Sequence, residues 1–169
     1  MIIVEDGTGL VNAESYVSVA DATVYHNNIG NAAWSALAND EIREQLLRKA
    51  TAFMLQRYRS SWNGWRKTTT QSLDWPRSLV QIKDAVSLNY YDDASVPELV
   101  KNACSSLALR ASTQILLADE KRAKSSVTIG PISTTYDPFS SQSIKYKEID
   151  TMLSPYFNTT GFQVRMVRG

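Results

Sequence analysis

The chain has 169 residues, of which 43% are hydrophobic, so it can bury one core of ordinary size and is too short for two full domains. Charged residues make up 21% of the chain and the formal net charge is +1, which demands neither a nucleic acid nor an anionic membrane as partner. The single cysteine excludes an internal disulfide. There is no signal-peptide pattern and no apolar run of the roughly eighteen residues that a membrane span needs, so we expect neither secretion nor membrane insertion.

Charge is distributed unevenly along the chain. Residues 1–42 contain no Lys or Arg and six carboxylates, whereas residues 43–67 hold seven cations and the single carboxylate Glu44. An acidic face on one copy can meet a basic face on the next, and complementary potentials of this kind favour specific association. The asymmetry therefore predicts head-to-tail contacts between copies of the chain.

The first elements are a short N-terminal arm and a helix. The apolar run at the start of the chain ends at a turn, and we assign residues 1–14 to the arm. Ser18 and Asp21 have the spacing of a helix capping box, with Asp in place of the usual Glu or Gln, and Gly30 suits a C-terminal stop. These signals predict a helix over residues 19–28.

A longer helix follows a helical turn at residues 32–38. Asn39 is a good N-cap, and the two acidic residues after it are favourable at the positive end of the helix dipole. Apolar side chains recur on one stripe and predict a helix over residues 40–58. The stripe consists of Ile42, Leu46, Ala50, Phe53 and Met54. Residues 60–93 lose this periodicity and are rich in Ser, Thr, Gly and Trp, so they predict a long irregular loop.

The rest of the chain holds a third long helix and a less regular end. A capping box around Pro97 predicts that the helix starts there, and its apolar stripe continues to about Glu120. Small residues in its middle allow close packing, which we assign to contacts between copies. Residues 126–136 are β-branched and interrupted by Gly-Pro, as in an extended segment with a bend. A short helix at residues 147–153 and a strand at residues 162–167 follow.

Together these elements predict a mainly α fold: a small helical bundle with a long irregular loop and an extended, β-containing C-terminal arm. We expect a helical domain over residues 1–122, which includes the N-terminal arm, and a docking arm over residues 123–169. The docking arm is too polar and extended to join the core, so we expect it to pack on another protein.

Few residues could carry catalysis. His26 has no neighbour at metal-ligand spacing and is expected to be structural. Cys104 lies among small residues of a helix, where a buried thiol is expected. The sequence indicates no neighbouring base that would deprotonate it to the nucleophilic thiolate. Asp92 and Asp93 precede a helix cap and suit a solvated turn better than a cation site. The sequence has no phosphate-binding loop and no nucleophile motif, so we expect no enzymatic activity, no metal and no cofactor.

One cluster combines aromatic rings with cations in the irregular loop and the helix end before it. Its members are Arg57, Arg59, Trp62, Trp65, Arg66, Lys67, Trp75 and Arg77. Bases stack on aromatic rings while phosphates pair with cations, so the cluster fits a surface for single-stranded nucleic acid. Tryptophans also pin irregular loops to a core, and together with arginine they anchor subunit interfaces. We favour loop packing, and all three roles stay open.

The order of several segments resembles a known family. The segments are GLVNAESYVSVADATVYH, NAAWSAL, WNGWR with QSLDWPRS, VPELVKNACSSLAL, and VTIGPISTTY with IDTMLSPYF. Together they resemble the DnaT-like single-stranded-DNA-binding family, whose members resemble head-to-tail adaptors, or connectors, of tailed bacteriophages. The resemblance covers nearly the whole chain in the same order.

The resemblance implies a virion structural protein, present in the host cytoplasm before assembly and in the neck of the virion afterwards. Copies of the chain would form a ring, commonly a dodecamer, that docks under the portal protein and supports the next neck or tail-terminator protein. The ring would extend the channel for the genomic DNA and touch it without sequence specificity. The docking arm would offer the portal the apolar side chains of Val127, Ile129, Ile132, Tyr136, Phe162, Val164 and Met166.

The alternative is a single-stranded-DNA-binding module of the DnaT-like type, which would use the aromatic and cationic cluster. Substituting its tryptophans should then remove oligonucleotide binding and leave assembly intact, whereas an adaptor predicts the opposite.

Overall fold

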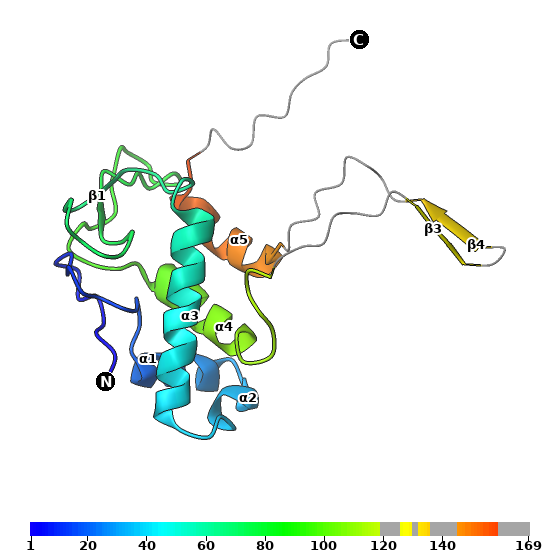
Figure 1. Cartoon of the computed structure of the whole chain (residues 1–169). Helices are drawn as coiled ribbons and strands as arrows, with labels where there is room; N and C mark the ends of the chain where they lie inside the picture. The colour runs from blue at the N-terminus through cyan, green and yellow to red at the C-terminus, as the bar shows by residue number, and fades with distance from the viewer. Residues whose placement is uncertain (119–125, 130–131, 136–144, 159–169) are drawn as a thin grey trace, which may run out of the picture.

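The computed structural model describes residues 1–118, 126–129, 132–135 and 145–158. Its elements in chain order are α1 (Val19–Asn28), α2 (Ala32–Ser35), α3 (Asp40–Tyr58), β1 (Trp65–Arg66), β2 (Arg77–Ser78), α4 (Glu98–Arg110), β3 (Ser126–Ile129), β4 (Ile132–Thr135), α5 (Lys147–Leu153) and the 3-10 turn η1 (Ser154–Tyr156). The α3 helix runs through the middle of the helical body, with α1 and α2 near one end and the irregular loop near the other (Figure 1). The predicted mainly α fold is confirmed.

The α3 helix begins and ends at the residues predicted from sequence. The side-chain oxygen of Asn39 accepts a hydrogen bond from the backbone N–H of Ile42 at 2.9 Å and so caps the first turn. The helix packs mainly against α4. Their shared core contains Leu46, Leu47, Ala50, Phe53, Met54, Val100, Ala103, Cys104, Leu107 and Ala108. The small residues of α4, which we expected at contacts between copies, are therefore buried within the chain.

The α1 helix is tied to α4 by a buried histidine. His26 is fully buried, and its Nε2 lies 3.1 Å from the backbone carbonyl of Ser105. Because a carbonyl only accepts, Nε2 carries the proton and Nδ1 accepts from the side-chain amide of Asn31 at 3.2 Å. Burial lowers the pKa of His26, which favours the neutral ring. The ring also stacks on Trp34 of α2 at a centroid distance of 4.7 Å, so it joins three helices.

The α4 helix ends earlier than predicted. It stops at Arg110 and does not continue to Glu120. The hydroxyls of Ser112 and Thr113 each donate to the carbonyl three residues back, at 2.6 and 3.2 Å. Ser and Thr side chains that bond nearby carbonyls compete with the helical backbone pattern, which explains the stop. The chain then turns so that Leu116 enters the core.

The segment of residues 145–158 also joins the core, contrary to the expectation that the chain beyond residue 122 packs elsewhere. Ile149 and Leu153 of α5 are fully buried, and α5 packs against α4. The hydroxyl of Tyr58 donates to the Asp150 carboxylate at 2.8 Å and joins the end of α3 to α5. A helix of two turns carries too little periodicity to reveal its buried face from sequence, because its packing partners decide it.

The N-terminal arm folds around its own buried carboxylate and packs on the irregular loop. Glu5 accepts hydrogen bonds from the backbone N–H groups of Gly7, Gly9 and Leu10 at 2.8 to 3.0 Å. Lys67, in the loop, donates to the carbonyl of Gly7 at 3.2 Å. The arm and the loop therefore hold each other in place.

Part of the charge asymmetry is neutralised within one chain. Arg48 of α3 lies 3.1 Å from the Glu14 carboxylate and 3.5 Å from that of Glu44. The contact with Arg48 lowers the pKa of Glu14. These ion pairs are solvated and contribute little to stability, but they show the acidic and basic segments meeting inside the subunit.

The β3 and β4 strands form an antiparallel hairpin in which Val127 faces Thr134 and Ile129 faces Ile132. The predicted extended segment is therefore a pair of strands. Among the residues expected to dock on a portal, Val127, Ile129 and Ile132 lie in this hairpin, whereas Tyr136, Phe162, Val164, Met166 and the predicted final strand lie outside the described residues. No helix in the described ranges has the length and apolar character to cross a bilayer.

Candidate nucleic-acid interface

Aromatic packing holds the irregular loop against the helices. Trp62 and Trp75 are buried, and their rings meet edge to face with centroids 5.8 Å apart. Trp75 also contacts Tyr156 at 5.3 Å, and Trp62 contacts Phe157 at 5.1 Å. Each such pair contributes about 0.5–1.5 kcal/mol beyond area burial. These two tryptophans anchor the loop and offer no face to an external ligand.

Arg77 also serves the loop. Its guanidinium donates to three backbone carbonyls, those of Asn63 at 2.8 Å, Asp74 at 3.2 Å and Gly64 at 2.7 Å. The side chain is buried, and burial lowers its pKa. The hydrogen bonds of Arg77 therefore join residues 63–64 to residue 74 within the loop.

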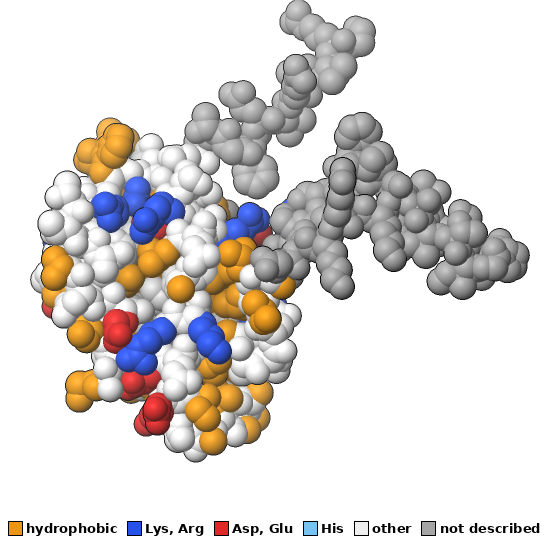
Figure 2. All heavy atoms as spheres, in the orientation of Figure 1, with side chains coloured by type: hydrophobic (Ala, Val, Ile, Leu, Met, Phe, Trp, Pro, Cys, Tyr) orange, Lys and Arg blue, Asp and Glu red, His pale blue; other side chains and the backbone are white. Residues whose placement is uncertain are grey.

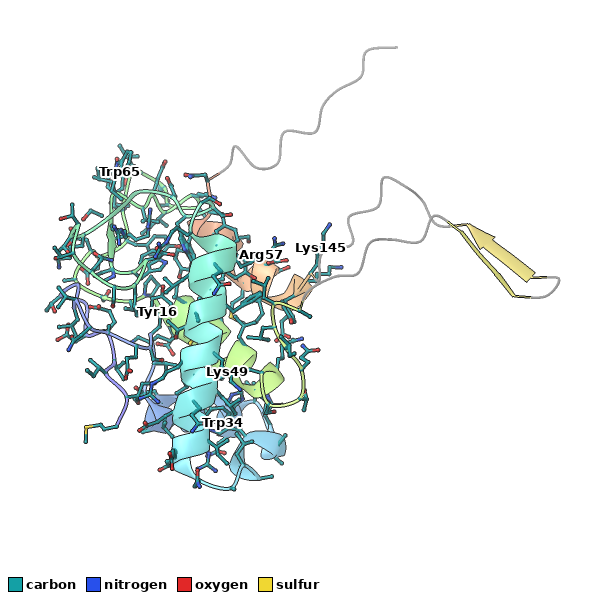
Figure 3. The ribbon with its side chains drawn as sticks, viewed as in Figure 1. Tyr16, Trp34, Lys49, Arg57, Trp65 and Lys145 are labelled. Carbon is teal, nitrogen blue, oxygen red and sulfur yellow. The ribbon has the colours of Figure 1, made fainter. Side chains whose placement is uncertain are left out.

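Trp65 is the loop tryptophan that faces solvent. It belongs to β1, which pairs with β2 so that Trp65 lies opposite Ser78. Gly64, just before it, has a φ of +65°, and a Cβ there would lie 2.3 Å from the carbonyl oxygen of Ser78. This tight backbone approach holds Trp65 at the edge of the loop with 73% of its surface exposed. Figure 3 shows Trp65 at the outer end of the loop, beyond the end of α3.

Arg59 and Asp74 form an ion pair behind Trp65. Arg59 follows the last residue of α3, and its Nε donates to Asp74 Oδ1 at 3.0 Å. The Arg59 side chain is 57% exposed, whereas that of Asp74 is 1% exposed. The terminal nitrogens of Arg59 have no partner among the described residues. The second carboxylate oxygen of Asp74, Oδ2, is buried and likewise lacks a partner among them.

Arg66 lies at the start of a tight turn formed by residues 66–71. Arg66 donates to the carbonyl of Gln71 at 3.0 Å and to that of Thr69 at 3.4 Å. The side-chain carbonyl of Gln71 accepts from the backbone N–H of Thr68 at 2.8 Å. These bonds shape a tight turn whose Arg66 side chain stays exposed.

A hollow of about 570 Å³ opens beside Trp65, in the size range of ligand pockets. We call it the Trp65 hollow; it is lined by Arg59, Trp65, Arg66, Thr68, Thr69, Asp74 and Arg77. Three guanidinium groups against one carboxylate make it cationic. Figure 2 shows one group of Lys and Arg side chains toward the upper end of the visible face and further groups lower down, beside Asp and Glu side chains.

The structure divides the aromatic and cationic cluster predicted from sequence. Arg59, Trp65, Arg66 and Arg77 meet at the Trp65 hollow, Trp62 and Trp75 lie in the core, and Lys67 contacts the N-terminal arm. Arg57 lies on the side of α3 nearer α5, away from Trp65 (Figure 3). Asp74, Thr68 and Thr69 were not among the predicted site residues. They join the site only because the loop folds back on itself, and no local spacing signals that.

The other residues that the sequence offered as candidates for catalysis or metal binding have structural contacts within the chain. Cys104 is buried, its Sγ lies 3.4 Å from the Thr51 hydroxyl, and burial raises its pKa to about 11. Asp92 accepts from the backbone N–H of Ala94 at 3.1 Å, in the predicted turn. Within the described ranges, no three His, Cys, Asp or Glu side chains gather where they could hold a metal ion.

Comparison with known proteins identifies one family. The family model described as "Putative DnaT-like ssDNA binding protein" matches residues 1–169. No curated protein and no solved structure matches the chain. The identification as a phage head-to-tail adaptor is therefore wrong, because the matching family is the DnaT-like one and nothing points to an adaptor family. The resemblance also implied the ring, the portal and tail-terminator partners and the place in the virion neck, and neither the comparison nor the structure tests these.

Proposed function

Because the chain belongs to the DnaT-like single-stranded-DNA-binding family, we propose that it binds single-stranded DNA and does so at the Trp65 hollow. The observation that carries the proposal is the position of Trp65, with 73% of its surface exposed at the rim of a hollow lined by three arginines. Every base has a face that can stack on an aromatic ring, and stacking of this kind is tolerant of sequence.

The cations around Trp65 suit the backbone of the strand. The Arg59 side chain is 57% exposed and its terminal nitrogens have no partner among the described residues, and a guanidinium fork matches the geometry of a phosphate. Arg66 is exposed and also lines the hollow. A strand that crosses the hollow would place one base on Trp65 and neighbouring phosphates beside these two arginines.

The near-zero net charge of the chain is compatible with this role. Binding needs a local cationic surface, and the lining of the Trp65 hollow holds three arginines and one carboxylate. A site with one exposed tryptophan and two exposed arginines makes few phosphate contacts. We therefore expect affinity that is modest for one subunit and that falls with added salt.

Binding of a fluorescent single-stranded oligonucleotide to the full chain tests the proposal. Trp65→Ala should weaken binding at least about fivefold, because stacking contributes roughly 1–3 kcal/mol per base, and Trp65→Phe should restore part of it. Arg59→Ala should also weaken binding. Arg57→Ala is the matched control, since it removes another exposed arginine two residues earlier, on the side of α3 away from Trp65. Equal affinities for the four variants and the unaltered chain would refute the proposal.

A further inference from the structure

The Trp65 hollow contains a group that a phosphate cannot satisfy. Asp74 is 1% exposed and carries one oxygen, Oδ2, that is buried without a hydrogen-bond partner among the described residues. The other oxygen accepts from Arg59. Buried acceptors without partners are uncommon in folded proteins, and each one needs an explanation, of which a functional role is one. Asp74 also lines the hollow, where a ligand can supply the missing donor.

The chemistry of the strand limits what that donor can be. The phosphates and deoxyriboses within a DNA strand carry hydrogen-bond acceptors only, so they would repel a carboxylate. The donors of single-stranded DNA are the N–H groups on the edges of its bases. An acidic side chain accepts well from an amino group of a base. The donor that pairs with Asp74 Oδ2 should therefore be an N–H group on the edge of a base.

The four bases differ in how well they fit a carboxylate. Guanine presents two adjacent donors, the ring N1–H and the N2 amino group, on one edge. Adenine and cytosine present an amino group beside a ring-nitrogen acceptor. Thymine presents a single N–H between two carbonyl oxygens, which a carboxylate would meet with repulsion. Guanine is accordingly the best partner for Asp74 and thymine the poorest.

We propose that the Trp65 hollow holds one base, preferably guanine, stacked on Trp65 with its Watson–Crick edge hydrogen-bonded to Asp74. This inference rests on the proposed function and adds base preference to it. On binding, Arg59 turns from Asp74 toward a phosphate. Its side chain is exposed and its one described hydrogen bond is the one to Oδ1, so the guanidinium is free to turn. The N–H groups on the base edge then donate hydrogen bonds to the buried carboxylate of Asp74.

The ligand side of the contact provides the first test. Three oligonucleotides of roughly 12 nucleotides, within the usual size of such sites, carry thymine throughout except for one central position. That position is guanine, inosine or thymine, and inosine lacks the N2 amino group. The full chain should bind the guanine strand about tenfold more tightly than the thymine strand, because hydrogen bonds to a charged group are strong. The inosine strand should lie between them.

The protein side provides the second test. Asp74→Asn keeps the shape of the side chain but replaces one acceptor by a donor, so it should abolish the preference for guanine. Circular dichroism and a melting curve establish whether this variant folds. If the variant does not fold, the three oligonucleotides still test the base preference of the unaltered protein.

The outcomes separate this inference from the proposed function. Equal binding of the three strands by the unaltered chain overturns the base preference and leaves single-strand binding standing. A guanine preference that persists in folded Asp74→Asn also overturns the role of Asp74. If none of the strands binds, the proposed function falls and the base preference with it.

Discussion

The Nε of Arg59 donates to Asp74 at 3.0 Å while the terminal nitrogens of the same guanidinium point to no described partner. In the free chain Arg59 is thus held at Nε by one hydrogen bond to a buried carboxylate, and its side chain is 57% exposed. The terminal nitrogens remain available, and a guanidinium can donate two parallel hydrogen bonds to a phosphate.

The salt dependence of the binding affinity should show directly whether Arg59 contacts a phosphate. Each phosphate contact of a single strand contributes roughly 0.7 to the slope of log affinity against log salt concentration. Arg59→Ala should reduce that slope by about this amount. Titrations at four or more salt concentrations measure it, with Arg57→Ala as control. A slope that both variants leave unchanged would show that Arg59 contacts no phosphate.

The loop tryptophans should separate into stability and binding residues. Trp62 is 3% exposed, so Trp62→Ala should lower the free energy of unfolding by about 3–5 kcal/mol. Trp65→Ala should change it by no more than about 0.5 kcal/mol, because the side chain makes few buried contacts. Urea denaturation of both variants measures the difference. Similar losses for the two would mean that Trp65 packs against the fold in solution.

Gly64 should be intolerant of a side chain. Its φ of +65° disfavours L residues, and a Cβ would lie 2.3 Å from the Ser78 carbonyl oxygen. Gly64→Ala should therefore cost at least about 2 kcal/mol in the free energy of unfolding and displace β1 from β2. Gly30→Ala is an informative control, because Gly30 also has positive φ but no atom within 4 Å of its Cβ position. The two variants should differ by the cost of the clash alone.

His26 should make the protein less stable in mild acid. Burial lowers its pKa in the folded chain, while the unfolded chain keeps a value of about 6.5. Above that pH both states are neutral at this ring and the residue adds no pH dependence. As the pH falls through about 6.5, the unfolded state takes up a proton that the folded state resists, so the free energy of unfolding falls. Denaturation at several pH values between about 7 and 5 measures the decline.

The matched variant for this experiment is His26→Gln, whose amide can still donate to the Ser105 carbonyl. It should lower stability at neutral pH and flatten the profile in the same range. A profile with the same decline in both proteins would assign the effect to other groups.

Cys104 should resist thiol reagents while the protein is folded. Its side chain is fully buried and burial raises its pKa to about 11, so little reactive thiolate forms at neutral pH. Labelling with a disulfide reagent should proceed only as fast as the protein opens, and quickly in denaturant. Fast labelling in native buffer would contradict the burial.

Much of the helical framework follows from local signals in the sequence. The bounds of α1, α3 and α5 match those predicted, because a side-chain cap, an apolar stripe or a following proline acts within a few residues of the position it determines. The irregular character of residues 60–93 was equally predictable, since it depends on composition. For such features the tertiary structure adds detail without changing the assignment.

Other features were decided only by contacts between distant parts of the chain. The end of α4 at Arg110 and the burial of α5 depend on what those segments pack against. In sequence, Trp62, Trp65 and Trp75 are equivalent members of one cluster. Two of them find aromatic partners beyond residue 150 and become core, and the third is turned outward by Gly64. Asp74 enters the site for the same reason: the folding of the loop buries its carboxylate beside Arg59, and burial is a property of the whole structure that no local pattern encodes.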